Sequence, residues 1–387
     1  MSIYPTKSEI RAKSGPKEWS RIERERARKA QNLDLLGKNG KPFYLVLVPK
    51  ILTLIAEIAE DRGFLSSLKL PKSYIKTRSQ KALKKEAYYS SRIEGAVTSF
   101  EEALRHMNRK VRRFSDESMQ MIYNNKEALE FMFQHKADNF SKDVILGLHK
   151  ILLYNTHKDK PIAVGQYRKG PIYVVNAQRE VVYEGPPPDQ AKKMMEQFVA
   201  WMNQKPPVHP LVDAAIAHLY FVHVHPFDDG NGRSARALSN LYLEKNGYSF
   251  INLLSPSDYF EHHRSAYYKS IQAAEGHGND ATYFALFYLE ALKSELQKIK
   301  DELKKNQKTQ GIRDVLDRET RTKLNRRQIK AIRWLLENAS PMTTRKYCKL
   351  NKCSDETARK DFNTLLGMDL ITTVGSGRST TYVLSVR

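Results

Sequence analysis

The stretch from residue 78 to residue 152 is dominated by helical segments that follow one another with short polar joints. Ser or Thr side chains stand before these segments, with acidic residues in the first turns, at Thr98 and Ser99, at Ser115 and at Ser141. Such residues are typical helix N-caps. Because short joints favour antiparallel neighbouring helices, the pattern predicts a mainly α fold built as a helical bundle.

One segment interrupts this helical pattern. Residues 171–175 and 181–183 are rich in β-branched and aromatic side chains, flank a polar turn and are followed by three prolines at 186–188. They predict a lone β-hairpin, which is marginal by itself and must lie on another element. Helices then resume: the almost wholly apolar residues 211–224 predict a central buried helix, and residues 233–246 predict an amphipathic one.

The C-terminal part has a different pattern. The last long helix turns Lys/Glu-rich near residue 293, and Gly311 interrupts it, which predicts a linker over 305–320. Three short helical segments and two β-runs follow, typical of a small winged helix-turn-helix domain. We therefore expect four parts: an N-terminal helical region (1–110), a catalytic core (111–304), the linker (305–320) and the winged-helix domain (321–387).

Charge and cysteine content narrow the class of protein. A net charge of +22 favours polyanionic partners, nucleic acid or phosphate-bearing ligands, although a generally basic surface also accounts for it. Cys348 and Cys353 have no second ligand pair nearby, so we expect reduced thiols and no zinc site. The N-terminus has no apolar signal, and charged residues interrupt the most apolar stretch, residues 43–60. These features predict a soluble, cytoplasmic protein.

The twelve residues "HPFDDGNGRSAR" (225–236), here called the motif loop, combine groups that packing alone does not require. The loop precedes a helix, whose N-terminus presents free N–H groups and a positive dipole end to anions. Glycines let backbone approach a ligand closely, an asparagine can brace the loop, and two arginines one turn apart can bind phosphate oxygens. The predicted nucleotide-binding residues are Gly230, Asn231, Gly232, Arg233 and Arg236.

Two further groups complete this prediction. Asp229 would be repelled by phosphates unless a divalent cation lies between them, which makes it a candidate Mg²⁺ ligand. His225 is the one group of the loop that can take a proton near neutral pH, so it is the candidate general base. The alternative is a structural loop in which Asp228 and Asp229 pair with the arginines. The nearby His218 and His223 are interpreted as core histidines, with a metal cluster as the alternative.

The motif loop resembles the signature of the Fic family at every defined position, and the resemblance extends over roughly residues 80–292. It implies an α-helical core, a β-hairpin called the flap, and transfer of AMP from ATP to a hydroxyl side chain of a target protein. By the same resemblance, His225 deprotonates that hydroxyl, Asp229 holds Mg²⁺, and the flap pairs with the target through Ile172, Tyr173, Val174 and Val175. The basic residues around the flap, including Arg168, are interpreted as solubilising or steering groups.

A second resemblance concerns control. "SSRIEG" fits the family's inhibitory motif at Ser90, Glu94 and Gly95, ahead of the core, and implies that Glu94 pairs with Arg236 and blocks the γ-phosphate of ATP. Two alternatives remain open: an enzyme that removes AMP with Glu94 positioning a water, and a DNA-binding regulator whose nucleotide site senses a ligand. In the latter, a recognition helix at 355–367 would offer Arg359, Lys360 and Asn363, with Arg378 in the wing. The acids Asp355, Glu356 and Asp361 weaken that case. Self-modification and a homodimer are further options.

Overall fold

The computed structural model describes residues 3–68, 70–108, 113–156, 162–175, 178–319, 324–338, 340–377 and 380–385. The chain divides into two compact units, residues 1–297 and 298–387. The predicted N-terminal region and nearly all of the predicted core therefore lie in one unit. No helix in the described ranges is long and apolar enough to cross a membrane.

The N-terminal part is not purely helical, which corrects the prediction for residues 1–110. Helix α1 (Lys7–Lys29) is followed by an antiparallel hairpin of β1 (Ala30–Leu36) and β2 (Pro42–Val46). In β1 the side chains of Leu33 and Leu35 are buried and that of Asp34 is exposed, the alternation of a half-buried strand. The hairpin brings its turn, Gly37 to Gly40, to the flap described below.

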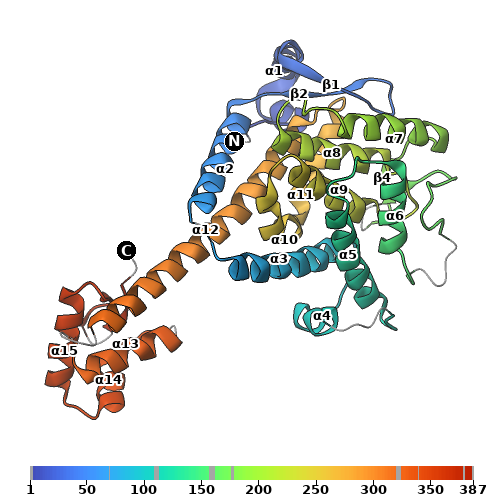
Figure 1. Ribbon diagram of the computed structural model, residues 1–387. Coiled ribbons are helices and arrows are strands. Elements are labelled where there is room, and N and C mark those ends of the chain that lie inside the picture. The colour runs from blue at the N-terminus through green and yellow to red at the C-terminus, as the bar shows by residue number, and fades with distance from the viewer. Residues whose placement is uncertain are drawn as a thin grey trace. The chain divides into compact units, whose positions relative to one another are not determined.

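Five helices follow: α2 (Pro49–Ser67), α3 (Lys72–Ile93), α4 (Phe100–Met107), α5 (Glu117–Gln134) and α6 (Lys142–Leu152). Figure 1 shows α3 running beside α10 and leading toward α4 and α5. Ser99 and Ser141 cap α4 and α6 as predicted. The cap of α5 is Asp116 and not Ser115, because the carboxylate of Asp116 accepts the N–H of Met119.

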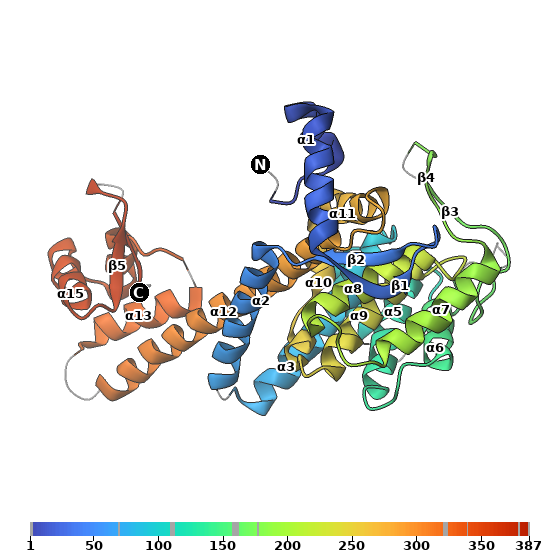
Figure 2. The same cartoon turned by 90° about the horizontal axis from the view of Figure 1, so that it is seen from above.

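The predicted lone hairpin is present. Strand β3 (Tyr173–Val175) pairs with β4 (Val181–Glu184) in antiparallel register, with Val174 opposite Tyr183. Figure 2 shows the pair projecting from the helical body of the first unit. Helix α7 (Pro188–Met202) begins at the last of the three prolines. The hairpin, residues 172–184, is called the flap from here on.

The centre of the first unit consists of α8 (Pro210–Val224) and α9 (Asn231–Lys245), which pack against each other. Helix α8 is buried as predicted, but α9 is also buried from Arg233 to Leu243, which corrects its description as amphipathic. The unit is completed by the 3-10 helix η1 (Ser249–Leu253), α10 (Pro256–His262) and α11 (Arg264–Gly276). The motif loop therefore joins two helices that are buried on all sides.

The predicted linker at 305–320 is helical as far as Glu319, because α12 (Thr282–Glu319) continues into it. Lys and Glu are good helix formers, and one glycine, Gly311, costs only about 1 kcal/mol in a helix. Beyond it lie α13 (Arg326–Asn338), α14 (Thr344–Asn351) and α15 (Asp355–Gly367), then the hairpin of β5 (Ile371–Val374) and β6 (Thr381–Leu384). This is the predicted order of three helices and two strands, with one apolar core of its own.

Candidate active site

The motif loop is fixed by its own backbone geometry. His225 follows the last residue of α8 and has a left-handed conformation (φ 47°), and Gly230 is left-handed (φ 79°) just before α9. Asn231 braces the loop: its Oδ1 accepts the N–H of Phe227 (3.0 Å) and its Nδ2 donates to the Phe227 carbonyl (2.8 Å). These two bonds are the bracing expected of Asn231, whereas its part in nucleotide binding stays a prediction.

His149 on α6, whose role the sequence did not reveal, holds the loop from the side. Its ring lies on that of Phe227, with centroids 3.7 Å apart and planes 2° from parallel. Nδ1 accepts the N–H of Gly165 (3.0 Å), so the proton is on Nε2, which donates to the carbonyl of Asp229 (3.1 Å). Burial lowers the pKa of His149 to about 4, so this imidazole is neutral and keeps both hydrogen bonds at neutral pH.

His225 is oriented as a base. Its Nδ1 lies 3.0 Å from the carbonyl of Val222 and donates to it, which leaves Nε2 as the proton acceptor. Burial lowers the pKa of His225, and this is opposed by the bond to Val222 and by the negative charge of Glu94. The imidazole is therefore neutral at neutral pH and able to take a proton, the state that a general base needs.

Arg168, predicted to be a surface group, is instead buried beside His225. Its Nε donates to the His225 carbonyl (2.8 Å), Nη1 donates to Gly170 (2.8 Å) and Nη2 donates to Pro186 (2.5 Å). Gly170 and Pro186 lie at the two ends of the flap. One guanidinium thus joins both ends of the flap to the backbone of the candidate base. In the sequence, nothing about the position of Arg168 next to a predicted hairpin indicates that its side chain is buried.

Arg233 is a buried arginine at the start of α9. Its Nη2 donates to Asp229 Oδ2 over 2.6 Å. Its Nε and Nη1 are buried and have no partner among the described residues. Buried guanidinium donors of this kind can bind an anion, and leaving them unpaired costs free energy. The structure thus combines both interpretations of the loop: an aspartate–arginine pair is present, and donors remain for a phosphate.

Asp229 fits the role of a magnesium ligand in part. Its carboxylate is one-third exposed (32%) and lies beside the unpaired donors of Arg233. Among the described residues no group of three His, Cys, Asp or Glu side chains is arranged to hold a metal. Mg²⁺ at phosphate sites commonly uses one or two carboxylates with the substrate phosphates as further ligands. Such a metal would therefore be bound by Asp229 together with the nucleotide.

Arg236 is occupied by the segment that carries the predicted inhibitory motif. Its Nη2 donates to Glu94 Oε1 (2.7 Å) and to the Ser90 carbonyl (2.9 Å), and its Nε donates to Ser90 Oγ (2.8 Å). This confirms the predicted contact between Glu94 and Arg236. The same Glu94 oxygen takes the space that a Cβ at Gly232 would need, so only glycine allows this approach. Gly95 follows with φ 99°, which turns the chain away after Glu94.

The flap presents two of its four predicted docking residues to solvent. Tyr173 and Val175 are half exposed (50% and 52%), whereas Val174 and Ile172 are partly buried. Tyr183 on the opposite strand points inward and donates to the His223 carbonyl over 2.5 Å. The alternation leaves one face of β3 available and fixes the other to the end of α8.

His218 and His223 confirm their interpretation as core histidines. His218 is fully buried, with Nε2 2.9 Å from the hydroxyl of Tyr267. His223 Nε2 accepts the N–H of Lys38 in the β1–β2 turn (3.1 Å), and its Nδ1 lies 3.2 Å from a carboxylate oxygen of Glu275. Both imidazoles are thus used inside the protein.

Comparison with known proteins shows which family this site is similar to. The Fic/DOC family model matches residues 139–243, which include the whole motif loop. Protein adenylyltransferase Fic of Nematostella vectensis is 29% identical over 228 residues (57% of this chain, 51% of the relative), and that of Aedes aegypti is 30% identical over 222 residues (56% and 42%). The Drosophila melanogaster protein of the same name is 39% identical over 115 residues (29% and 21%). The chain thus spans about half the length of the curated relatives it matches, or less.

Solved structures agree in fold. A Fic family protein from Desulfovibrio desulfuricans aligns with a TM-score of 0.57 at 21% identity, over 88% of this chain and 97% of that one. Fic-1 from C. elegans aligns with a TM-score of 0.53 at 21% identity, over 77% of both chains. The matched residues 139–243 carry both the helices and the loop on which His225, Arg233 and Arg236 lie. Residues 139–243, with the motif loop, thus match the Fic/DOC family in sequence, and the fold agrees with that of solved Fic proteins.

Proposed function

We propose that this protein is a protein adenylyltransferase that transfers AMP from ATP to a hydroxyl side chain of a target protein, or of itself, and that Glu94 inhibits it. The curated relatives bear the name of this activity. The observation that carries the proposal is the position of Glu94, which binds Arg236 directly over the motif loop. A carboxylate at the N-terminal end of a helix is stabilised by the donors there, so Glu94 takes a position that favours an anion such as a phosphate.

The chemistry follows from the groups of the loop. Nε2 of His225 takes the proton of the target hydroxyl, whose oxygen attacks the α-phosphorus of ATP. The bond from that phosphorus to the bridging oxygen breaks, AMP stays on the target and pyrophosphate leaves. The unpaired donors of Arg233 and the N-terminus of α9 bind the phosphates, so negative charge that develops in the transition state meets fixed donors. When bound at Asp229, Mg²⁺ would neutralise phosphate charge.

Inhibition follows from competition for one guanidinium. While Glu94 holds Arg236, the γ-phosphate of ATP has no free partner there and would face a carboxylate. Glu94 is 26% exposed, so it can leave without opening the core. Removal of its carboxylate should therefore expose Arg236 to the nucleotide.

The flap supplies the contact with the target. Extended segments add to exposed strand edges through backbone hydrogen bonds, with side chains giving specificity. The exposed Tyr173 and Val175 on β3 would cover such a segment and bring its hydroxyl toward His225. A contact of this kind would recognise the backbone of the target more than a particular sequence of side chains.

The test is labelling of cell extract and of the protein itself with α-labelled ATP and Mg²⁺, read by gel and mass spectrometry. The comparison includes wild type, Glu94→Gly and the double variant Glu94→Gly, Arg236→Ala. The control is Glu101→Gly, which changes an exposed glutamate in the first turn of α4. We expect Glu94→Gly to gain activity and the double variant to lose the gain. If the enzyme instead removes AMP, Glu94→Gly abolishes release of AMP from a modified protein and gains no labelling activity.

A second candidate function, DNA binding by residues 321–387, is favoured by α15. Arg359, Lys360 and Asn363 are exposed on this helix. Asp361, which weakens the case in the sequence, is buried and bound to Arg327 (2.8 Å) and to the hydroxyl of Tyr347 (2.9 Å). The predicted wing residue Arg378 lies outside the described residues.

The DNA-binding proposal is tested on the full chain by retention on duplex DNA in a salt gradient. Loss of each phosphate contact should reduce the slope of log K against log salt by about 0.9. We expect Arg359→Ala and Lys360→Ala to elute at lower salt, whereas Arg333→Ala, an exposed arginine on α13, serves as the control. Elution of all variants with wild type would exclude α15 as the DNA-binding helix.

A further inference from the structure

Helix α3 presents polar side chains to α9 at four-residue spacing, and the inhibitory glutamate is the last of them. Glu86 contacts Asn240, Ser90 contacts Arg236, and Glu94 contacts Arg236 and lies against Gly232. Because residues i, i+4 and i+8 share one face of a helix, these contacts form one row. The position of Glu94 on the motif loop therefore depends on how the rest of this row is held.

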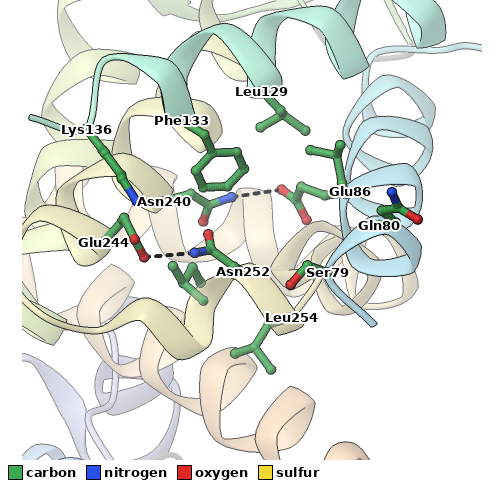
Figure 3. Close-up of a pocket in the computed structure, with 12 residues that line it drawn as sticks. Ser79, Gln80, Glu86, Leu129, Phe133, Lys136, Asn240, Glu244, Asn252 and Leu254 are labelled. Carbon is green, nitrogen blue, oxygen red and sulfur yellow. Dashed lines mark hydrogen bonds between the residues drawn. The ribbon is translucent and has the colours of Figure 1, made fainter. Parts of the chain in front are cut away.

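Glu86 is the most strongly bonded member of the row. Its Oε2 accepts the Ser257 N–H (3.0 Å) and the Ser255 hydroxyl (3.1 Å), and its Oε1 accepts the Ser257 hydroxyl (2.6 Å) and the Asn240 amide (3.4 Å). The side chain is 4% exposed. Figure 3 shows it between α3 and Asn240 of α9. One carboxylate thus joins α3 to α9 and to the first turn of α10.

Apolar packing is incomplete at this point of α3. A cavity of about 280 Å³ lies beside Glu86, lined also by Leu83 and Phe133 (Figure 3). Burial raises the pKa of Glu86, while the bonds from Ser257 and the charge of Arg236 oppose the rise. A buried carboxylate is costly unless it is fully bonded, so a cluster of this kind holds one geometry strongly. The carboxylate bonds therefore add to the packing that fixes α3 here.

We propose that Glu86 is a positioning residue for inhibition: it anchors α3 on α9 so that Glu94, two turns further on, stays on Arg236. The proposal rests on the proposed function, because it concerns the inhibitory state of the same site. Loss of the anchor shifts the equilibrium toward the state in which Arg236 is free for ATP. Removal of a hydrogen-bonded buried charge shifts such an equilibrium by roughly tenfold or more, so we expect a gain in adenylylation of about that size.

The chain offers a matched control for the anchor. Lys85, the neighbouring residue on α3, also contacts α10, with Nζ 2.9 Å from Asp258 Oδ2, but it does not belong to the row that faces α9. Lys85→Met should leave inhibition unchanged, although it also removes a bond between α3 and α10. Glu86→Gln keeps the size and part of the bonding, so it should retain most of the inhibition.

The experiment measures initial rates of labelling with α-labelled ATP for wild type, Glu86→Ala, Glu86→Gln and Lys85→Met, each with and without Glu94→Gly. The anchor role predicts a gain for Glu86→Ala in the wild-type background and no change in the Glu94→Gly background. A merely structural defect would lower the labelling rate in both backgrounds. An effect that does not depend on Glu94 would change the rate by the same factor in both. Either result overturns the proposal.

Two further outcomes are decisive. If Glu94→Gly gains activity and Glu86→Ala does not, the anchor role is refuted while the proposed function stands. If Glu94→Gly itself gains nothing, the proposed inhibition fails and the role of Glu86 fails with it. Should Glu86→Ala not fold, Ser257→Ala removes only the 2.6 Å hydroxyl bond. A gain of about threefold in that variant supports the anchor, and an unchanged rate overturns it.

Discussion

Arg168 Nε donates a 2.8 Å hydrogen bond to the backbone carbonyl of His225. The same guanidinium binds Gly170 and Pro186, at the two ends of the flap. His225 has a left-handed backbone (φ 47°), a conformation that costs a residue with a side chain of order 1–3 kcal/mol and persists only where the surroundings hold it. Arg168 is one of the groups that hold it, and it makes the geometry of the base depend on the flap.

Arg168→Lys should therefore reduce adenylylation although the charge is kept. A lysine ammonium cannot reach three carbonyls as a planar guanidinium does. We expect kcat to fall by about tenfold or more and KM for the target to rise, with the affinity for ATP little changed. Lys169→Met, which changes the exposed neighbour, is the control. Equal rates for both variants would show that the bond to His225 does not matter for catalysis.

His225→Ala should abolish transfer and leave nucleotide binding nearly intact. The imidazole acts on the proton of the target hydroxyl, whereas the phosphates are bound by the loop and by Arg233. General-base catalysis contributes about a hundredfold or more, so a loss of at least that size is expected in the Glu94→Gly background. Calorimetry of ATP binding and single-turnover labelling measure the two effects separately. Labelling near the parent rate would exclude His225 as the base.

The pH profile provides an independent check on the base. Burial lowers the pKa of His225 below its ordinary 6.5, so the imidazole stays neutral as pH falls through that value. The acid limb of kcat/KM, which reports the free enzyme, should therefore lie below pH 6.5. In the Glu94→Gly background it should lie lower still, because the negative charge of Glu94 raises this pKa. An acid limb above pH 6.5 in both proteins would contradict the assignment.

Much of this site was predictable because a short motif determines it. The loop and the helix after it follow from residue types at fixed spacings. The ion pair of Glu94 with Arg236, across 142 positions, was implied by the resemblance of "SSRIEG" to the family's inhibitory motif. The long helices follow from periodicity and from caps such as Ser99 and Ser141. The inhibitory role of Glu94 and the roles of the loop residues stay predictions.

The groups that support the site were not predictable in this way. Arg168 and His149 stabilise the loop through backbone carbonyls and N–H groups, which any sequence possesses, so their partners leave no pattern. Glu86 is a buried charge in a Lys-rich segment that resembles a solvated helix face. The β1–β2 hairpin was missed because its apolar residues continue into α2 and hide the change of period.

His149→Phe should weaken catalysis without unfolding the protein. The phenyl ring keeps the stacking on Phe227, but the bonds to Gly165 and to the Asp229 carbonyl are lost. Two backbone groups then lack partners, at about 1–3 kcal/mol each, and the loop loses its fixed position. We expect kcat/KM to fall by tenfold to a hundredfold, with a smaller change in the melting temperature. A change in stability with unaltered kinetics would assign His149 to folding alone.

Asp213→Asn should stabilise the protein in a pH-dependent way. Asp213 lies in the first turn of α8 and is fully buried, and burial raises its pKa from 3.8 to about 7. The folded state thus binds a proton that the unfolded state releases above pH 3.8, so stability from this residue is lost progressively from that pH upward and fully once the pH has risen through 7. Because the amide does not titrate, Asp213→Asn should raise the free energy of unfolding by at most about 4 kcal/mol at pH 8. At pH 5 the gain should be less than half of that. Chemical denaturation at both pH values measures the difference, with the exposed Asp138→Asn as the control. An equal effect at pH 5 and pH 8 would mean that Asp213 does not titrate in the folded protein.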